Sequence, residues 1–433
     1  MEKLSLIFIL LFLSPIITKH VKFNFQRTKD IYSDDDEELS MNILNNNMFV
    51  NINVGNQIIP FLISFDKELT FIMDDNFTFA QYSKTKSSTF KKLSQDTNKY
   101  VFDNIRLGFN ASETLKLTNE ESEEIQVSDF PFVLGTYQDE KTSFKFPAQL
   151  GLKKRTYENP CIFNFVEQLK KRKIINSEVF FFKYTSDEAG ELYLGEYPHE
   201  FDKNYDSKYL VQSSSLEVGP SNNWFLHFNY LIFGEEKINI QGKTTQLSPE
   251  IGMIVMYMQL EKIFYDNFFK ELITQKKCVR IKHRSNYNYI CEDTIDINKF
   301  NNVTFRHIGM EYDFVFEPKD LFYHYYDRYF FLISFRDTFY ITFGKPFFKK
   351  FNVIFNQDSK QLAIYSYVKE NNTEFKKLMI PTVLIIIFAI LAFILVVILF
   401  RYKLKRRKLN EIEDTFDYTP NPNKDTRLTS IND

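Results

Sequence analysis

The fold is decided by residues 49–73, which read FVNINVGNQIIPFLISFDKELTFIM. Apolar side chains at every second position of 50–54 predict a half-buried strand. Gly55-Asn56 supplies a turn, and a second apolar strand over 60–63 leads to one acid, Asp66. A carboxylate at the end of a buried strand is costly unless it is paired or hydrogen-bonded, so Asp66 is a candidate functional residue.

Composition narrows the class of protein. The 433 residues are enough for two lobes of ordinary size plus terminal segments. A formal net charge of −2 lacks the basic excess of nucleic-acid binders, so no nucleic-acid partner is expected. The 48 Phe and 25 Tyr, against only 12 Gly, favour β structure. The six His show no metal-ligand spacing and no glycine-rich phosphate loop occurs, so neither a metal nor a cofactor is expected.

Both ends of the chain carry apolar runs. Residues 1–18 have one basic residue before a short apolar segment, as in a cleavable secretory signal; the alternative is a buried N-terminal helix. Residues 382–400 are uncharged and long enough to cross a bilayer as a helix. Basic residues gather at 401–408, which places the C-terminus in the cytoplasm. We expect a single-pass type I membrane protein of the secretory or endomembrane system or the cell surface, with its N-terminal domain outside.

Sequons and cysteines fit that topology. Four glycosylation sequons lie on the expected outer side, at Asn76, Asn110, Asn302 and Asn371. Cys278 and Cys291 are close in sequence and flank a polar loop, so they are expected to pair in an oxidising compartment. Cys161 is expected to be a buried free thiol.

Further motifs follow in the order known from one family. They include Pro147-Ala-Gln-Leu-Gly-Leu152, a helical pattern over 164–172, Gly190-Glu-Leu-Tyr-Leu-Gly195 and the closing stretch 339–358. From about residue 48 to residue 366 the chain therefore resembles the pepsin-like aspartic proteases. The resemblance implies a mainly β, bilobal fold with a cleft between the lobes. It also makes 20–29 similar to the start of a protease prosegment, while the acidic run 34–38 predicts a solvated linker.

The resemblance also implies where a catalytic site would lie. In this family each lobe carries an Asp-Thr-Gly loop, and the two aspartates share one proton. Here Asp66-Lys67-Glu68 and Glu250-Ile251-Gly252 stand at those places, and Tyr100 lies near the position of the flap tyrosine. Glu250 has one methylene more than Asp, and both hydroxyl residues are missing, so the resemblance implies a degenerate dyad of Asp66 and Glu250.

Two functions remain open from the sequence. The first is a membrane-tethered pepsin-fold ectodomain that has lost efficient proteolysis and binds a peptide or protein in the cleft between the lobes. The alternative is an active aspartic endopeptidase that uses Asp66 and Glu250, because an acid is present at both expected positions.

The expected division of the chain is a signal peptide at 1–18, a short prosegment-like linker at 19–47, a first lobe at 48–206, a second lobe at 207–368, a juxtamembrane stalk at 369–380, a transmembrane helix at 381–400 and a cytoplasmic tail at 401–433.

Overall fold

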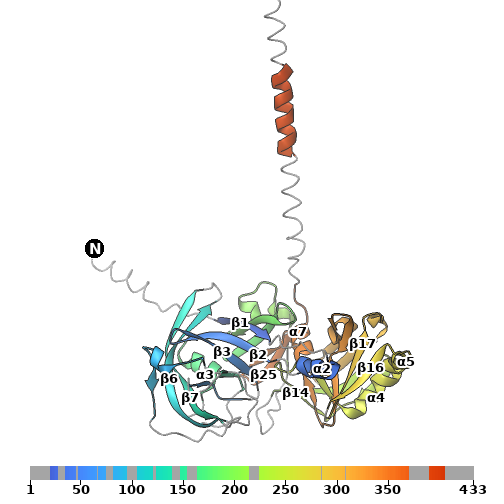
Figure 1. Cartoon of the computed structure of the whole chain (residues 1–433), viewed down its shortest axis with the longest axis horizontal. Helices are drawn as coiled ribbons and strands as arrows, with labels where there is room; N and C mark the ends of the chain where they lie inside the picture. Colours follow the sequence, from blue (N-terminus) through green and yellow to red (C-terminus); the bar gives the residue numbers. More distant parts are fainter. Residues whose placement is uncertain are drawn as a thin grey trace, which may run out of the picture. The chain divides into compact units, whose positions relative to one another are not determined.

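The computed structural model divides the chain into a compact unit that ends at Val368 and a second unit that begins at Lys369 (Figure 1). It describes residues 20–27, 35–44, 47–65, 67–74, 81–94, 105–119, 123–138, 147–153, 163–213, 224–283, 285–307, 309–369 and 390–404. In the second unit, 390–404 form a helix. None of the helices in these ranges is both long enough and apolar enough to span a membrane.

A first sheet is built mainly from the N-terminal half of the chain. Its spatial order is β11 (Leu210–Gln212), β25 (Gln361–Tyr365), β24 (Ile354–Asn356), β9 (Val179–Tyr184), β10 (Ala189–Leu194), β1 (Val21–Arg27), β2 (Met48–Val54), β3 (Gln57–Ser64), β8 (Ala148–Gly151), β4 (Phe71–Met73), β7 (Glu124–Gln138), β6 (Ile105–Asn119) and β5 (Lys91–Lys92). Most neighbours are antiparallel, whereas β3 pairs with β8 and β4 with β7 in parallel.

A second sheet follows in the C-terminal half. Its order is β19 (Asp313–Phe316), β18 (Val303–His307), β12 (Phe225–Phe233), β14 (Thr244–Leu247), β23 (Ile341–Phe343), β15 (Ile254–Tyr257), β22 (Ile333–Arg336), β17 (Asn286–Glu292), β21 (Arg328–Phe331) and β20 (Phe322–Tyr325), with β13 (Glu236–Asn239) on β12 and β16 (Cys278–His283) on β17. Figure 1 shows the two sheets as two bodies, one coloured blue to green and one yellow to orange.

Short helices connect and cover the strands. The α-helices are α2 (Asp36–Leu44), α3 (Phe165–Lys171), α4 (Glu261–Phe264), α5 (Lys270–Thr274), α6 (Pro318–Leu321) and α7 (Lys345–Phe351), and a π-helical turn, Tyr265–Phe269, joins α4 to α5. Short 3-10 turns lie at Lys84–Lys86, Pro198–Glu200, Ser207–Tyr209, Met258–Leu260 and Ile297–Lys299.

Aromatic side chains make up much of the core. In the second sheet Phe269 stacks on Tyr289 with the ring centroids 4.0 Å apart. Where the two halves of the chain meet, Trp224 packs edge-on against Phe355 (5.1 Å) and Phe180 (6.4 Å). Many of the phenylalanines therefore pack ring against ring in the core. The expected mainly β fold is confirmed.

Several local expectations are also confirmed. The stretch 49–73 forms β2, β3 and β4, and the helical pattern over 164–172 becomes α3. Cys278 and Cys291 form a disulfide, and they pair directly across the β16–β17 hairpin. Cys161 lies outside the described residues.

The stretch expected to be a prosegment-like, solvated linker carries two packed elements instead. β1 lies inside the first sheet between β10 and β2, and its alternate residues Val21, Phe23, Phe25 and Arg27 are buried. The acidic run lies at the start of α2, where negative charge suits the helix dipole. Apolar side chains recur every second residue in β1 and about every fourth residue in α2. Both elements therefore have an apolar side that packs against the rest of the protein.

Because β1 is an inner strand, Phe25→Ala is expected to lower the free energy of unfolding by about 3–5 kcal/mol. The Phe25 side chain is fully buried, with ring centroids 5.7 Å from Phe182 and 5.1 Å from Tyr184. Chemical denaturation of the full-length chain measures the loss. Asn24→Ala, on the exposed face of the same strand, is the matched control and should change stability by no more than about 0.5 kcal/mol. Equal small effects at both positions would contradict the buried placement of β1.

Candidate functional site

Two strand–loop–strand units of the same topology carry the candidate acids. In the first, β3 runs parallel to β8 and β4 returns antiparallel to β8. In the second, β14 runs parallel to β23 and β15 returns antiparallel to β23. Asp66 falls in the loop between β3 and β4, and Glu250 falls in the loop between β14 and β15.

Each loop has a glycine beneath it, and the two glycines occupy corresponding positions in the two units. A Cβ atom on Gly151 would stand 2.7 Å from the carbonyl oxygen of Leu69. A Cβ atom on Gly344 would stand 2.2 Å from the carbonyl oxygen of Met253. Neither position can hold a side chain without moving the backbone above it, so both crossing strands need glycine here.

The two candidate acids occupy corresponding positions relative to these contacts. Asp66 comes three residues before Leu69, and Glu250 comes three residues before Met253. Glu250 is half-buried, whereas Asp66 and the flap candidate Tyr100 lie outside the described residues. By sequence position Glu250 therefore corresponds to Asp66, and their action as a dyad stays a prediction.

The second loop is closed differently from the first. The carbonyl oxygen of Lys67 accepts a hydrogen bond from the backbone N–H of Lys153, at 3.1 Å. At the corresponding place after β23 the chain has Pro346, which has no N–H to donate. The carbonyl oxygen of Ile251 instead accepts from the N–H of Lys345, one residue earlier, at 2.7 Å. The two loops are therefore closed by donors at different positions, residue 153 in the first and residue 345 in the second.

Helix α2 covers the second loop. The backbone N–H of Gly252 donates to the carbonyl oxygen of Leu44 at 2.9 Å. A Cβ atom on Gly252 would stand only 1.7 Å from the carbonyl oxygen of Ile43. The apolar side of α2, formed by Leu39, Ile43 and Leu44, packs in one cluster with Met253, Val255, Ile290, Phe330 and Leu332. The glycine of the second loop thus lets the end of α2 pass directly over the loop (Figure 1).

A buried cation holds the residue before Glu250. Arg27, at the end of β1, is only 2% exposed. Its guanidinium donates to the carbonyl oxygen of Pro249 and, at 2.8 Å, to the hydroxyl of Tyr184. Burial raises the pKa of Tyr184; the Arg27 cation opposes this rise, and the carboxylates of Glu188 and Glu250 add to it. The charges of Arg27 and Glu250 thus act on the same buried hydroxyl.

A second buried cation, Lys345, lies next to the loop, and its backbone N–H donates to the carbonyl oxygen of Ile251. Lys345 begins α7 and is 5% exposed, and its ammonium donates to Glu188 at 3.1 Å. Burial lowers the pKa of Lys345, the Glu188 carboxylate opposes this, and the nearby Arg27 cation adds to the lowering. An aspartic dyad works by sharing one proton between two carboxylates, and nearby cations favour the ionised form instead. The charges around this loop therefore disfavour that chemistry.

Sequence reasoning missed Arg27, Lys345 and the cover that α2 provides. The alternation of residues 21–27 indicates a strand, and the apolar spacing of 39–44 indicates a helix. Both segments were nevertheless expected to be a linker. Nothing local in the sequence shows that a guanidinium from β1 reaches a loop 222 positions away.

The other candidate residues lie apart from this loop. Asn110 is half-buried in β6 and Asn302 is exposed just before β18, while Asn76 and Asn371 fall outside the described residues. Glycosylation at all four stays a prediction. In the described ranges no group of three or more His, Cys, Asp or Glu side chains could hold a metal ion.

Comparison with known proteins gives matches in structure. No protein-family model matches the chain, and no curated protein matches it in sequence. The crystal structure of conglutin gamma, a basic 7S globulin from lupine seeds, matches with a TM-score of 0.59 at 11% identity, covering 81% of this chain and 96% of that one. Basic 7S globulin from soybean matches with a TM-score of 0.59 at 12% identity and the same coverage of both chains. At such identities the likeness concerns the fold alone, and that fold is pepsin-like.

The close contact at Gly252 predicts a local effect of a single methyl group. Gly252→Ala would place a Cβ atom against the carbonyl of Ile43, so α2 is expected to leave the loop while β14 and β15 both stay paired with β23. Limited proteolysis should then cut within 35–47 at least about tenfold faster than in the unchanged chain, since α2 loses its packed face. Gly242→Asn is the control, because a Cβ atom there meets nothing within 4 Å and Asn tolerates positive φ. Equal cleavage of both variants would contradict the contact.

Proposed function

We propose that this chain is a membrane-anchored ectodomain of pepsin-like fold that lacks efficient protease activity and binds a peptide or protein. The observation that carries the proposal is the cover over the second loop: the Gly252 N–H already donates to the carbonyl oxygen of Leu44 of the same molecule.

The side chains of both loops support the loss of proteolysis. Lys67 and Ile251 stand where the family has hydroxyl residues that hydrogen-bond the carboxylates. Glu250 carries its carboxyl one methylene farther out than Asp would. Since a displacement of about 1 Å can cost on the order of a hundredfold in rate, this combination argues against efficient catalysis.

The contacts of α2 support the proposal of a peptide ligand on the second lobe. A short segment lies there with two kinds of interaction: a backbone hydrogen bond to the loop and apolar side chains against β15 and β17. An extended or helical peptide uses the same two kinds of contact when it adds to a groove. A ligand on this side would therefore replace α2, while the first lobe offers its own loop and the β6–β7 hairpin.

Membrane attachment is proposed from the sequence. The run 382–400 is uncharged and is followed by a basic cluster. Its described part is helical, and the apolar side chains of 390–400 are exposed rather than packed in a core. Together with the signal-like residues 1–18, this supports a type I topology with the compact unit outside.

An active aspartic endopeptidase is the second candidate. The observation in its favour is that Glu250 corresponds to Asp66 by sequence position, so an acid stands on both loops.

A protease assay separates the two candidates. The full-length chain is incubated with a broad peptide library from pH 3 to pH 7, with and without a statine-type inhibitor. We expect no inhibitor-sensitive cleavage at any pH, because the two loops differ in their side chains and closing hydrogen bonds and the second loop is covered by α2. Inhibitor-sensitive cleavage that disappears in both Asp66→Asn and Glu250→Gln would establish the endopeptidase instead.

Peptide binding is tested by opening the covered side. Leu39→Ser with Ile43→Ser removes the two apolar anchors of α2, and Glu38→Ser, on its exposed side, is the control. The anchor variant should retain about tenfold more library peptide than the control, because the apolar surface under α2 becomes available. Equal retention by both variants would argue against a peptide site on the second lobe.

A further inference from the structure

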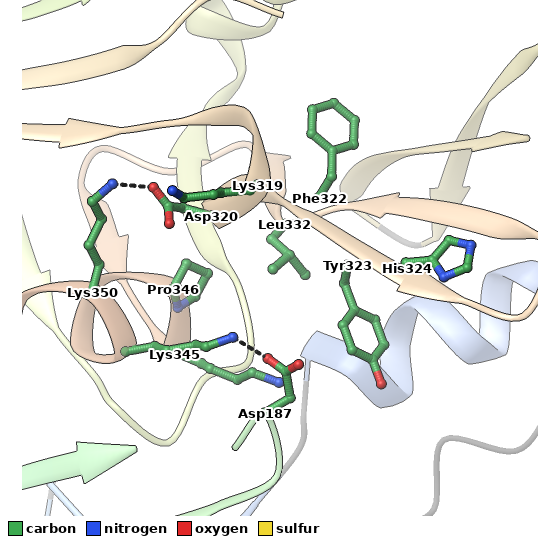
Figure 2. Close-up of a pocket in the computed structure, with 11 residues that line it drawn as sticks. Asp187, Lys319, Asp320, Phe322, Tyr323, His324, Leu332, Lys345, Pro346 and Lys350 are labelled. Atoms are coloured by element: carbon green, nitrogen blue, oxygen red, sulfur yellow. Dashed lines mark hydrogen bonds and ion pairs between the residues drawn. The ribbon is translucent and has the colours of Figure 1, made fainter. Parts of the chain in front are cut away.

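A cavity of about 260 Å³ lies beside the covered loop, at the junction of the two halves of the chain (Figure 2). One wall comes from the turn between β9 and β10, which supplies Asp187. The other walls come from α6, β20 and the first turns of α7. The space is comparable to a small-molecule pocket, and such pockets often form where two parts of a protein meet.

Positive charge predominates on the lining. Lys319, Lys345, Lys349 and Lys350 line the cavity, against only two acids, Asp187 and Asp320. Lys349 pairs with Asp187 at 2.6 Å, and Lys350 pairs closely with Asp320. Figure 2 shows the Lys350–Asp320 pair at one side of the cavity.

The other two lysines also pair with carboxylates outside the lining, and the lining carboxylate of Asp187 lies close enough to act on Lys345 as well. Lys345 donates to Glu188, and Lys319 pairs with Glu317 at 2.7 Å. Neither of these glutamates lines the cavity. Their carboxylates offset the charge of these lysines from outside the cavity. The lining itself has four lysines and two acids.

Lys345 gives the strongest reason for an anionic ligand. Its side chain is 6% exposed, so bulk water solvates the ammonium poorly. An ammonium has three N–H donors, and the carboxylate of Glu188 takes one of them. An anion that enters the cavity can accept from the same ammonium and restore part of the solvation that burial removes.

The remaining lining is apolar or aromatic. It consists of Phe322, Tyr323, His324, Leu332 and Pro346. The Tyr323 ring lies 5.2 Å from the ammonium of Lys345. A bare inorganic anion would leave this surface unfilled. The four lysines already hold carboxylates as partners, which shows that a carboxylate suits their positions.

We propose that this cavity binds a small carboxylate with an aromatic or aliphatic body. The carboxylate would take the place of the Asp187 carboxylate at Lys345 and Lys349, and the body would lie against Tyr323 and Leu332. The carboxylate can come from a free organic acid or from the C-terminus of a peptide. The site is separate from the two loops, and the proposal does not depend on the function proposed above.

Calorimetric titration of the full-length chain tests this with matched pairs of probes. 3-Phenylpropionate and N-acetylphenylalanine represent the free acid and the peptide terminus, and their neutral amides are the counterparts. We expect any acid that binds to do so at least about tenfold more tightly than its amide, because only the charged carboxylate forms ion pairs with the lysines. Binding of 3-phenylpropionate alone would identify the ligand as a free organic acid. Stronger binding of N-acetylphenylalanine would identify it as the C-terminus of a peptide.

Lysine variants locate the site. Lys345→Met and Lys349→Met should each weaken carboxylate binding by about tenfold or more, which is the loss of one charged hydrogen bond. Lys349 is half-exposed, so its variant remains informative if Lys345→Met fails to fold. Lys171→Met is the control: this lysine also pairs with a carboxylate, Glu167 at 2.6 Å, but lies on α3 away from the cavity. Equal affinity for acids and amides, binding unaffected by both cavity variants, or no binding at millimolar concentration would overturn the proposal.

Discussion

The backbone N–H of Gly252 donates to the carbonyl oxygen of Leu44, and this hydrogen bond joins the N-terminal part of the chain to the loop on which any aspartic chemistry would depend. The contact requires glycine, since a Cβ atom at 252 would meet the carbonyl of Ile43 at 1.7 Å. A residue that looks in the sequence like the remnant of a catalytic motif is thus needed in this molecule for packing. The surviving glycine is therefore no evidence of surviving catalysis.

Cations from two other elements reinforce the same loop. Arg27 extends from β1 to the carbonyl of Pro249, and Lys345 begins α7 with its ammonium on Glu188. A buried cation is costly unless it is paired, so both must be held by the acceptors that surround them. Arg27 thus places a positive charge next to Glu250, and Lys345 adds a second buried cation near Arg27. A shared proton between carboxylates is disfavoured there, whereas binding of an anionic group is favoured.

Much of the fold could be predicted from local patterns, and much of the site could not. Patterns that involve residues close in sequence predicted their structures correctly. The alternation over 50–54 is β2, the helical spacing over 164–172 is α3, and the neighbouring Cys278 and Cys291 form the disulfide. Pro346 illustrates the opposite case, because its missing N–H matters only where α7 meets a loop about a hundred residues earlier. The acidic run 34–38 shows a related limit: Asp35 and Glu38 are exposed as their charge indicates, but the apolar residues after them decide the packing of α2.

The central claim is that α2 covers the second loop in the folded protein, and amide hydrogen exchange at Gly252 tests it most directly. The account predicts that this amide exchanges as slowly as the paired amides of β15, because its acceptor is the Leu44 carbonyl rather than water. In the Leu39→Ser and Ile43→Ser double variant it should exchange faster while β15 stays protected. Fast exchange at Gly252 in the unchanged chain, at the rate of an exposed loop, would contradict the account.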